Sequence, residues 1–161
     1  MPIWVSDTSP ICYFARLGLL DVLHKLLGQI RVPMSVVDEI DRGRTFIPEL
    51  PDLRVLDWVE IEMVVGNIPD ASISQLGPGE TEALALAKSL PDVCVLMDDF
   101  QAREQAEKSG ISVRGTLALL LMAKEEKYVQ EVRPLIDQLE KMGFRLSDSL
   151  QNTVLSLAGE D

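Results

Sequence analysis

The sequence predicts an α/β domain with a mostly parallel β-sheet. Short apolar runs rich in β-branched residues alternate with helical patterns along the 161 residues, as expected of β-α-β units with right-handed crossovers. The run 93–97, Val-Cys-Val-Leu-Met, has the continuous apolar character of a buried parallel strand, although periodicity does not distinguish it from a buried helix. Two runs end at acids: Asp7 follows 3–6, and Asp98 and Asp99 follow 93–97. Ligands of open α/β sheets bind at the carboxyl ends of strands, so these acids mark a candidate site.

The first half of the chain should alternate strands and helices. The expected order is strand 3–6, helix 10–16, helix 19–27, strand 29–32 and helix 34–40. Ser9 directly before Pro10 is the pattern of an N-cap followed by the first helical residue. Residues 43–54 and 66–79 contain the prolines and glycines of irregular chain, and 55–65 is apolar and extended without an indicated partner strand.

The second half continues the alternation and ends in helices. The expected order is helix 79–90, strand 93–97, helix 100–109, strand 111–114, helix 116–127, helix 134–142 and a last helix from about 147 to 157. Gly110 and Gly143 are placed as helix stops, because glycine readily takes the left-handed conformation after a helix. We expect one domain over 1–161, with the helices of about 131–158 packed as an extension.

Composition limits the classes of function. The net charge of −11, from 26 acids and 15 bases, opposes bulk electrostatic binding to nucleic acid, which depends on Lys and Arg at phosphates. A nucleic-acid role would need a local basic patch or metal ions, and a basic protein is another suitable partner. The start lacks a basic signal-peptide region, and the longest apolar run is far shorter than the ~20 residues that span a bilayer. With Cys12 and Cys94 expected as free thiols, the chain should be cytoplasmic, without a membrane partner.

Each acid also has an ordinary structural explanation. Asp7 could cap the following helix, although Ser9 is better placed, and Glu39 could be an exposed helical acid. Glu80 and Glu82 lie in the first turn of a helix, where acids are favoured by the helix dipole. The pair Asp98-Asp99 precedes a helix that needs only one cap, so the other acid is the informative one.

If these carboxylates converge, they should bind a cation. Two carboxylates ~5 Å apart repel by ~3 kcal/mol at an effective dielectric of ~20. Oxygen ligands without histidine or cysteine suit Mg²⁺ or Mn²⁺, and such a site can activate water against a phosphodiester. The bare sequence leaves open whether they converge.

Four motifs together resemble a PIN-domain protein. In order along the chain they are V-S-D-T-S-P, V-P-M-S-V-V-D-E-I, G-E-T-E-A-L-A-L-A and V-L-M-D-D-F-Q-A-R. The tail, from G-T-L-A-L-L-L-M-A-K through G-F-R-L-S-D, is similar to a bacterial and archaeal branch often found as the toxin of a toxin–antitoxin pair. The resemblance implies a Rossmann-like three-layer α/β/α sandwich and Mg²⁺- or Mn²⁺-dependent ribonuclease activity.

The resemblance also assigns roles to single residues. The implied catalytic acids are Asp7, Glu39, Glu82 and Asp99; the implied metal ligands are Asp7, Glu82, Asp98 and Asp99; the accessory residues are Thr8, Ser9, Glu80 and Arg103. Glu82 is preferred to Glu80 because the A-L-A-L-A run follows it directly. Two departures concern activity: many relatives have Asp in place of Glu82, and Thr or Ser in place of Met97.

The implied function is a metal-dependent endoribonuclease acting on RNA, held inactive by a cognate antitoxin and expected to form a homodimer. A PIN-like module that binds RNA or protein without catalysis is the alternative. A phospho-receiver domain fits less well, because it would need an acidic pair near the first strand and a lysine where R-G-T-L stands.

His24 is expected to be non-catalytic, and Trp4 and Trp58 are expected to lie in the core or an interface. Arg42 and Arg44 are expected to lie in a solvated loop unless they contact phosphate.

Overall fold

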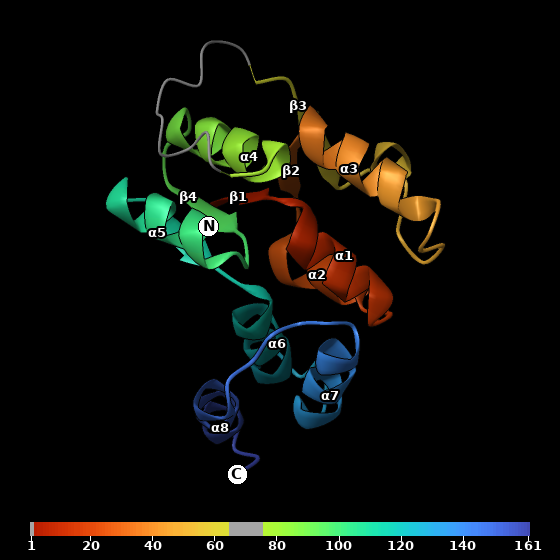
Figure 1. Ribbon diagram of the computed structural model, residues 1–161, viewed down its shortest axis with the longest axis vertical. Helices are drawn as coiled ribbons and strands as arrows, with labels where there is room; N and C mark the ends of the chain where they lie inside the picture. Colours follow the sequence, from red (N-terminus) through yellow and green to blue (C-terminus); the bar gives the residue numbers. More distant parts are fainter. Residues whose placement is uncertain (1, 65–75) are drawn as a thin grey trace.

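The computed structural model describes residues 2–64 and 76–161, and its centre is a five-stranded parallel sheet (Figure 1). The strands are β1 (Ile3–Ser6), β2 (Ile30–Pro33), β3 (Val59–Glu62), β4 (Val93–Leu96) and β5 (Ser112–Arg114), in the order β3-β2-β1-β4-β5. Neighbouring strands are parallel throughout, with Trp4 opposite Ile30 and Val5 opposite Val95 in the register. The predicted α/β class is confirmed. The extended stretch at 55–65 contributes β3, which pairs with β2; residue 65 lies outside the described residues.

The helices follow the predicted order with small differences at their ends. They are α1 (Thr8–Arg16), α2 (Leu20–Leu27), α3 (Met34–Arg44), α4 (Pro78–Lys88), α5 (Phe100–Lys108), α6 (Thr116–Glu125), α7 (Arg133–Lys141) and α8 (Asp148–Leu157), with a short 3₁₀ turn η1 (Leu53–Val55). Most of the loop expected at 66–79 lies outside the described residues, and α4 begins within its last part. Two boundaries were wrong. Asp7, in extended conformation, is the N-cap of α1, and Ser9 lies inside the helix. Helix α3 continues to Arg44, so Arg42 and Arg44, expected in a loop, lie in its last turn.

Alternate residues of the strands face two separate hydrophobic clusters. Trp4 and Leu96 point to the cluster that contains α1, α2 and α6, whereas Val5 and Met97 point to the cluster that contains α4 and α5. This alternation is the period-2 pattern of a strand, and burial of both faces explains why β1 and β4 are almost entirely apolar. The result is a three-layer α/β/α arrangement, as the resemblance implied.

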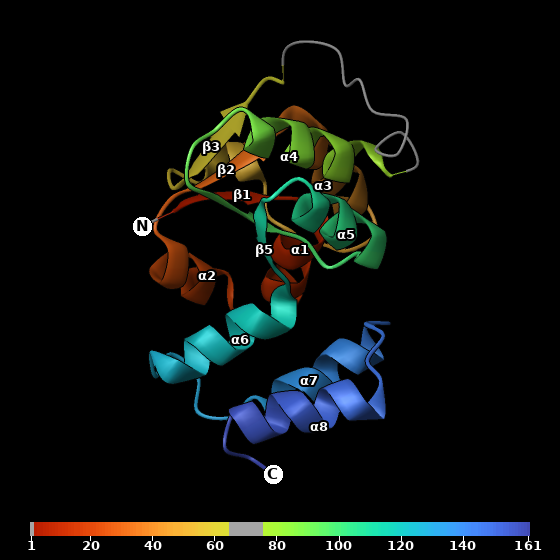
Figure 2. The same ribbon diagram turned by 90° about the vertical axis from the view of Figure 1, so that its left-hand side faces the viewer.

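Helices α7 and α8 lie beyond α6, on the side away from the sheet (Figure 2). They join the core through buried apolar residues, among them Ile136, Leu139, Val154 and Leu155. The Glu160 carboxylate ties them to α6: it accepts hydrogen bonds from Lys124 Nζ at 2.8 Å and from the backbone N–H of Val132 at 2.7 Å.

The two tryptophans and the two cysteines all belong to the core or pack against it. Trp4 is buried in the core, and Trp58 is half-buried with its ring stacked on the exposed His24 at a centroid distance of 4.8 Å. Cys12 and Cys94 are free. Among the helices in the described part of the chain, none is long and apolar enough to cross a membrane.

Candidate active site

The direction of the sheet's connections changes between β1 and β4. The chain runs outward from β1 to β2 and β3 on one side, and β4 and β5 lie on the other. In open α/β sheets, the carboxyl ends of the two strands at such a point border the ligand crevice. Ser6 is paired with Leu96 at this edge, and the Asp7 backbone N–H donates to the Leu96 carbonyl at 3.0 Å. Asp7 and Asp98 therefore leave adjacent strands at the same edge.

Asp7 is the most unusual side chain of this edge. It is 2% exposed, and its Oδ1 atom has no hydrogen-bond partner within the part of the chain that the structure describes. Burial raises the pKa of Asp7 well above its ordinary value, and the negative charges of Asp98 and Glu80 raise it further. Asp7 occupies the N-cap position of α1 without a capping hydrogen bond from its side chain, although the backbone N–H of Ser9 lowers its pKa against the larger effect of burial. Capping alone therefore does not explain this acid.

Glu39 reaches the same region from the second turn of α3. Its carboxylate accepts hydrogen bonds from Thr8 Oγ1 and from the backbone N–H of Gly79, the latter at 2.8 Å. A Cβ atom at position 79 would lie 2.8 Å from Glu39 Oε2, so only glycine allows this approach without displacing the carboxylate. Glu39 thus connects the beginnings of α1 and α4 and is not a simple solvent-facing acid.

Glu80 and Glu82 face different neighbours. Glu80 accepts a hydrogen bond from the Gly77 backbone N–H at 3.0 Å, as in a capping box. Burial raises the pKa of Glu80, and Asp99 and Glu39 add to this rise against the opposing Gly77 hydrogen bond. The Glu82 carboxylate instead accepts from the Ser35 backbone N–H at 3.2 Å.

Of the two glutamates, Glu80 is the one whose charge acts on Asp7. Two helical positions are ~200° apart around the axis, so Glu80 and Glu82 point to opposite sides of α4. Glu80 contributes to the raised pKa of Asp7, and Glu82 is not among its causes. The A-L-A-L-A run identified the helix but carried no information about which glutamate faces the acids.

Asp98 and Asp99 each serve a helix N-terminus. Asp99 is the N-cap of α5, and its Oδ1 accepts from the Ala102 backbone N–H at 2.9 Å. Asp98 Oδ1 accepts from the Thr116 backbone N–H, and Asp98 Oδ2 accepts from Thr116 Oγ1, both at 2.7 Å. Burial raises the pKa of Asp98, against the Thr116 hydrogen bonds and the positive charge of Arg103. The acid not needed to cap α5 is therefore Asp98, the acid that also perturbs Asp7.

The accessory residues divide into two groups. Thr8 holds Glu39, and Arg103 lies beside Asp98, whereas no side-chain hydrogen bond of Ser9 is seen with the described residues. Met97 is fully buried and packs with α4 and α5.

The sequence interpretation missed Thr116. The signal that could have found it is a hydroxyl residue after the strand at 111–114, because parallel strands bring their carboxyl ends to one edge.

The carboxylates fit a divalent cation by chemistry. They supply only oxygen donors, they repel one another, and a buried Asp7 oxygen is without a partner. As placed, however, no three side chains of Asp, Glu, His or Cys within 2–64 and 76–161 are grouped closely enough to hold one ion. Thr8 and Thr116 hold Glu39 and Asp98 in hydrogen bonds of their own.

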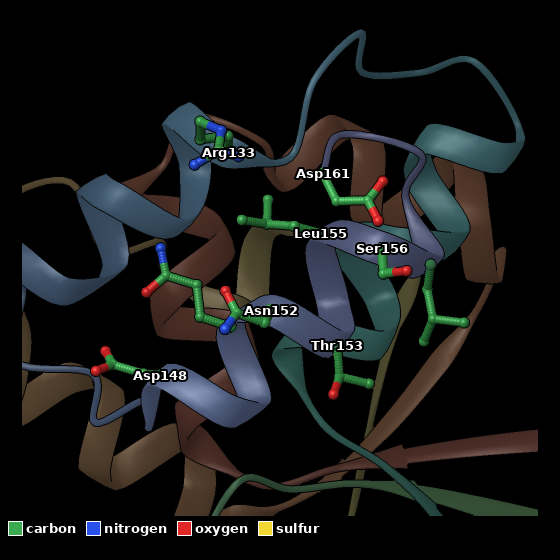
Figure 3. Close-up of a pocket in the computed structure, with 9 residues that line it drawn as sticks. Arg133, Asp148, Asn152, Thr153, Leu155, Ser156 and Asp161 are labelled. Carbon is green, nitrogen blue, oxygen red and sulfur yellow. The ribbon is translucent and has the colours of Figure 1, made fainter.

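A cleft of ≈ 630 Å³ begins beside Asp98 and runs between α5, α6 and α8. Its lining, which defines the α5–α6–α8 cleft, consists of Asp98, Phe100, Arg103, Glu104, Glu107, Gly115, Leu117, Ala118, Leu121, Phe144, Arg145, Leu150, Thr153, Val154 and Leu157. Phe100 is 75% exposed and Leu157 is 72% exposed, so the cleft presents apolar side chains to solvent. A second, more open hollow of ≈ 900 Å³ lies over α8 and the start of α7 (Figure 3). It contains none of the acids discussed above.

Comparison with known proteins agrees with this architecture. A family model described as DUF3368, a PIN domain, matches residues 3–160, and no curated protein gives a significant match. Proteins of the PIN-domain family are generally nucleases and typically depend on metal ions. Because the match covers nearly the whole chain, this protein belongs to the PIN-domain family.

Proposed function

We propose that this protein is a metal-dependent endoribonuclease. The observation that carries the proposal is the state of Asp7. Its carboxylate is buried with one unpartnered oxygen, and it lies near Asp98 and Glu80 where the direction of the strand connections changes between β1 and β4. Buried polar groups are almost always hydrogen-bonded, and an exception needs a reason. A bound cation supplies one, because it would ligate the free oxygen and reduce the repulsion between the acids.

The chain's own residues take distinct parts in this proposal. Asp7, Asp98 and Glu80 would hold Mg²⁺ or Mn²⁺, with Glu39 and Asp99 at the margin of the site. When bound, the ion polarises a phosphodiester and makes water a better nucleophile. Thr8 and Gly79 hold Glu39 in place. Arg103, next to Asp98, offers a positive charge to an RNA phosphate in a protein that is otherwise strongly acidic.

Cleavage of RNA by paired variants tests the proposal. Wild-type protein with Mn²⁺ should cleave a labelled single-stranded RNA internally, and EDTA should abolish the activity. Glu80→Gln should lose most of the rate, whereas Glu82→Gln, with the same change of charge on the same helix, should retain it. Loss of rate in Glu82→Gln alone would restore the assignment made from the sequence. Wild-type protein without cleavage in either metal would contradict the proposal.

We propose further that this protein acts in the cytoplasm and that a cognate antitoxin covers its α5–α6–α8 cleft. The cleft adjoins Asp98 and is lined largely by apolar residues, and the net charge of −11 favours a partner with basic residues. Co-expression with the product of an adjacent small reading frame should give a stable, inactive complex. Leu157→Glu should prevent complex formation, whereas Phe46→Glu, at a position 84% exposed and outside the cleft lining, should not. An unaffected complex would place the partner elsewhere.

A second candidate function is binding without catalysis. Two observations favour it: the described carboxylates are not grouped around one ion position, and Met97 stands where many relatives have a hydroxyl residue. A protein of this kind would bind RNA or a partner with the same affinity in EDTA and in Mn²⁺. Metal-dependent binding would count against it.

We also propose a homodimer that uses the same α5–α6–α8 cleft when the antitoxin is absent. Leu150 and Leu157 on α8 and Phe100 on α5 are exposed apolar side chains near one another on the α5–α6–α8 cleft, and a second copy could bury them. Sedimentation at tens of micromolar should then show a dimer that Leu157→Glu converts to monomer. A wild-type monomer under these conditions would contradict the proposal.

A further inference from the structure

Asp98 is held at both carboxylate oxygens by a single residue. The Thr116 backbone N–H donates to Oδ1 and the Thr116 hydroxyl donates to Oδ2, each at 2.7 Å, and Thr116 is 0% exposed. Two attachment points fix the rotation of the carboxylate about its own axis, which one hydrogen bond would not. Because an ionised carboxylate has about four lone-pair positions, this arrangement leaves each oxygen able to accept one more partner.

Gly115 makes room for this contact. A Cβ atom at position 115 would lie 2.9 Å from Asp98 Oδ1 and 3.2 Å from Arg103 Nη1. The backbone of Gly115 has φ −102° and ψ −179°, a conformation open to any residue. The glycine is therefore required for space and not for its conformational freedom. The pair Gly115-Thr116 forms a socket, which we call the Asp98 socket.

The Asp98 socket joins two separate parts of the chain. Gly115 is the N-cap residue of α6 and has no side chain that could cap the helix. Asp98, which lies 17 positions earlier and follows β4, caps it instead by accepting from the Thr116 backbone N–H. Capping needs only one oxygen accepting from a backbone N–H. The additional hydrogen bond from the Thr116 hydroxyl to Oδ2 is unnecessary for a cap. It orients Asp98, the acid whose negative charge raises the pKa of Asp7.

We propose that Thr116 is a positioning residue that fixes Asp98 for sharing a cation with Asp7. The inference rests on the proposed function. The hydroxyl that meets Asp98 comes from the start of α6, whereas the side chain of Met97, next to Asp98 in the sequence, is buried in the core. Residues that orient metal ligands typically change metal affinity or activity 10- to 100-fold when mutated.

The test compares Thr116→Val, which keeps the shape but removes the hydroxyl, with Thr116→Ser, which keeps the hydroxyl. Calorimetric titration with Mn²⁺ alone should show affinity about tenfold weaker for Thr116→Val and close to wild type for Thr116→Ser. In RNA cleavage, Thr116→Val should lower kcat with little change in KM. Thr45→Val, at an exposed threonine at the end of α3, should behave as wild type in both assays.

A double-mutant cycle distinguishes positioning from a general effect on folding. In the Asp98→Asn background, Thr116→Val should produce no further loss of Mn²⁺ affinity, because the ligand it positions is already gone. If Thr116→Val does not fold, Thr116→Ala replaces it in the same double-mutant cycle. Equal Mn²⁺ affinity in wild type and Thr116→Val, or an equal loss in Thr116→Ser, would overturn the inference while leaving the nuclease proposal in place. A wild type that neither binds Mn²⁺ nor cleaves RNA would overturn both.

Discussion

Replacing Glu160 by glutamine should destabilise the protein in a strongly pH-dependent way. The Glu160 side chain is only 10% exposed and accepts from Lys124 Nζ at 2.8 Å and from the backbone N–H groups of Val132 and Arg133 at 2.7 and 3.0 Å. Burial would raise the pKa of Glu160, but the hydrogen bond from Lys124, followed by those from the two backbone groups, lowers it from 4.5 to about 2.

The shift converts to a free energy of unfolding. A fall in pKa from 4.5 to about 2 corresponds to at most about 3 kcal/mol, and screening by solvent and salt reduces it to about 2 kcal/mol. Because the folded-state pKa lies below the unfolded-state value, this stabilisation is complete above pH 4.5 and is lost as the pH falls toward 2. Glu160→Gln should therefore cost about 2 kcal/mol at pH 7 and close to nothing near pH 2.

Urea unfolding of wild type and Glu160→Gln from pH 2 to pH 7 measures this difference directly. Asp161→Asn is the matched control, since it removes one negative charge from the exposed neighbouring residue and should change stability by less than about 0.5 kcal/mol at every pH. A Glu160→Gln variant whose loss of stability is the same at pH 3 and pH 7 would refute the reasoning, because the loss would then come from packing and not from the charged hydrogen bonds.

Two further predictions concern the acids themselves. Asp7→Asn should raise the free energy of unfolding in EDTA at pH 8, because the raised pKa of Asp7 means that its charge destabilises the folded state. The gain should vanish as the pH falls below the ordinary pKa of an aspartate, where the carboxyl is protonated in both states, and thermal unfolding at the two pH values measures it. Gly79→Ala should displace the Glu39 carboxylate and lower the rate of RNA cleavage about tenfold, while it reduces the free energy of unfolding by only about 1 kcal/mol. Gly77→Ala is the control: its Cβ would lie at an ordinary 3.6 Å from the Glu80 carboxylate, so neither the cleavage rate nor the stability should fall.

Much of the architecture could be predicted from local sequence. The β-branched runs ending at Asp7 and Asp98 identified β1 and β4, because strands buried on both faces must be continuously apolar. The partner of the stretch at 55–65 could not be predicted, since pairing depends on the order of strands in the sheet and not on any one of them.

The site was predicted less completely, and for a geometric reason. Choosing between Glu80 and Glu82 requires the rotation of α4 about its axis, which packing against the sheet determines and a weakly amphipathic, alanine-rich helix does not reveal. The bond between Asp98 and Thr116 depends on β4 and β5 being neighbours, so it is absent from any local pattern. Hydroxyl residues close in sequence to an acid were noticed, whereas the one close in space was not.

The central claim is that Asp7 and its neighbours hold a divalent cation, and the unfolding midpoint in Mn²⁺ tests it most directly. A ligand that binds only the folded state must raise the midpoint as its concentration increases. We predict that millimolar Mn²⁺ raises the midpoint of wild-type protein but leaves that of Asp7→Asn unchanged, with Glu82→Gln responding as wild type does. A wild-type midpoint indifferent to Mn²⁺, or an Asp7→Asn variant that responds as strongly as wild type, would contradict the claim.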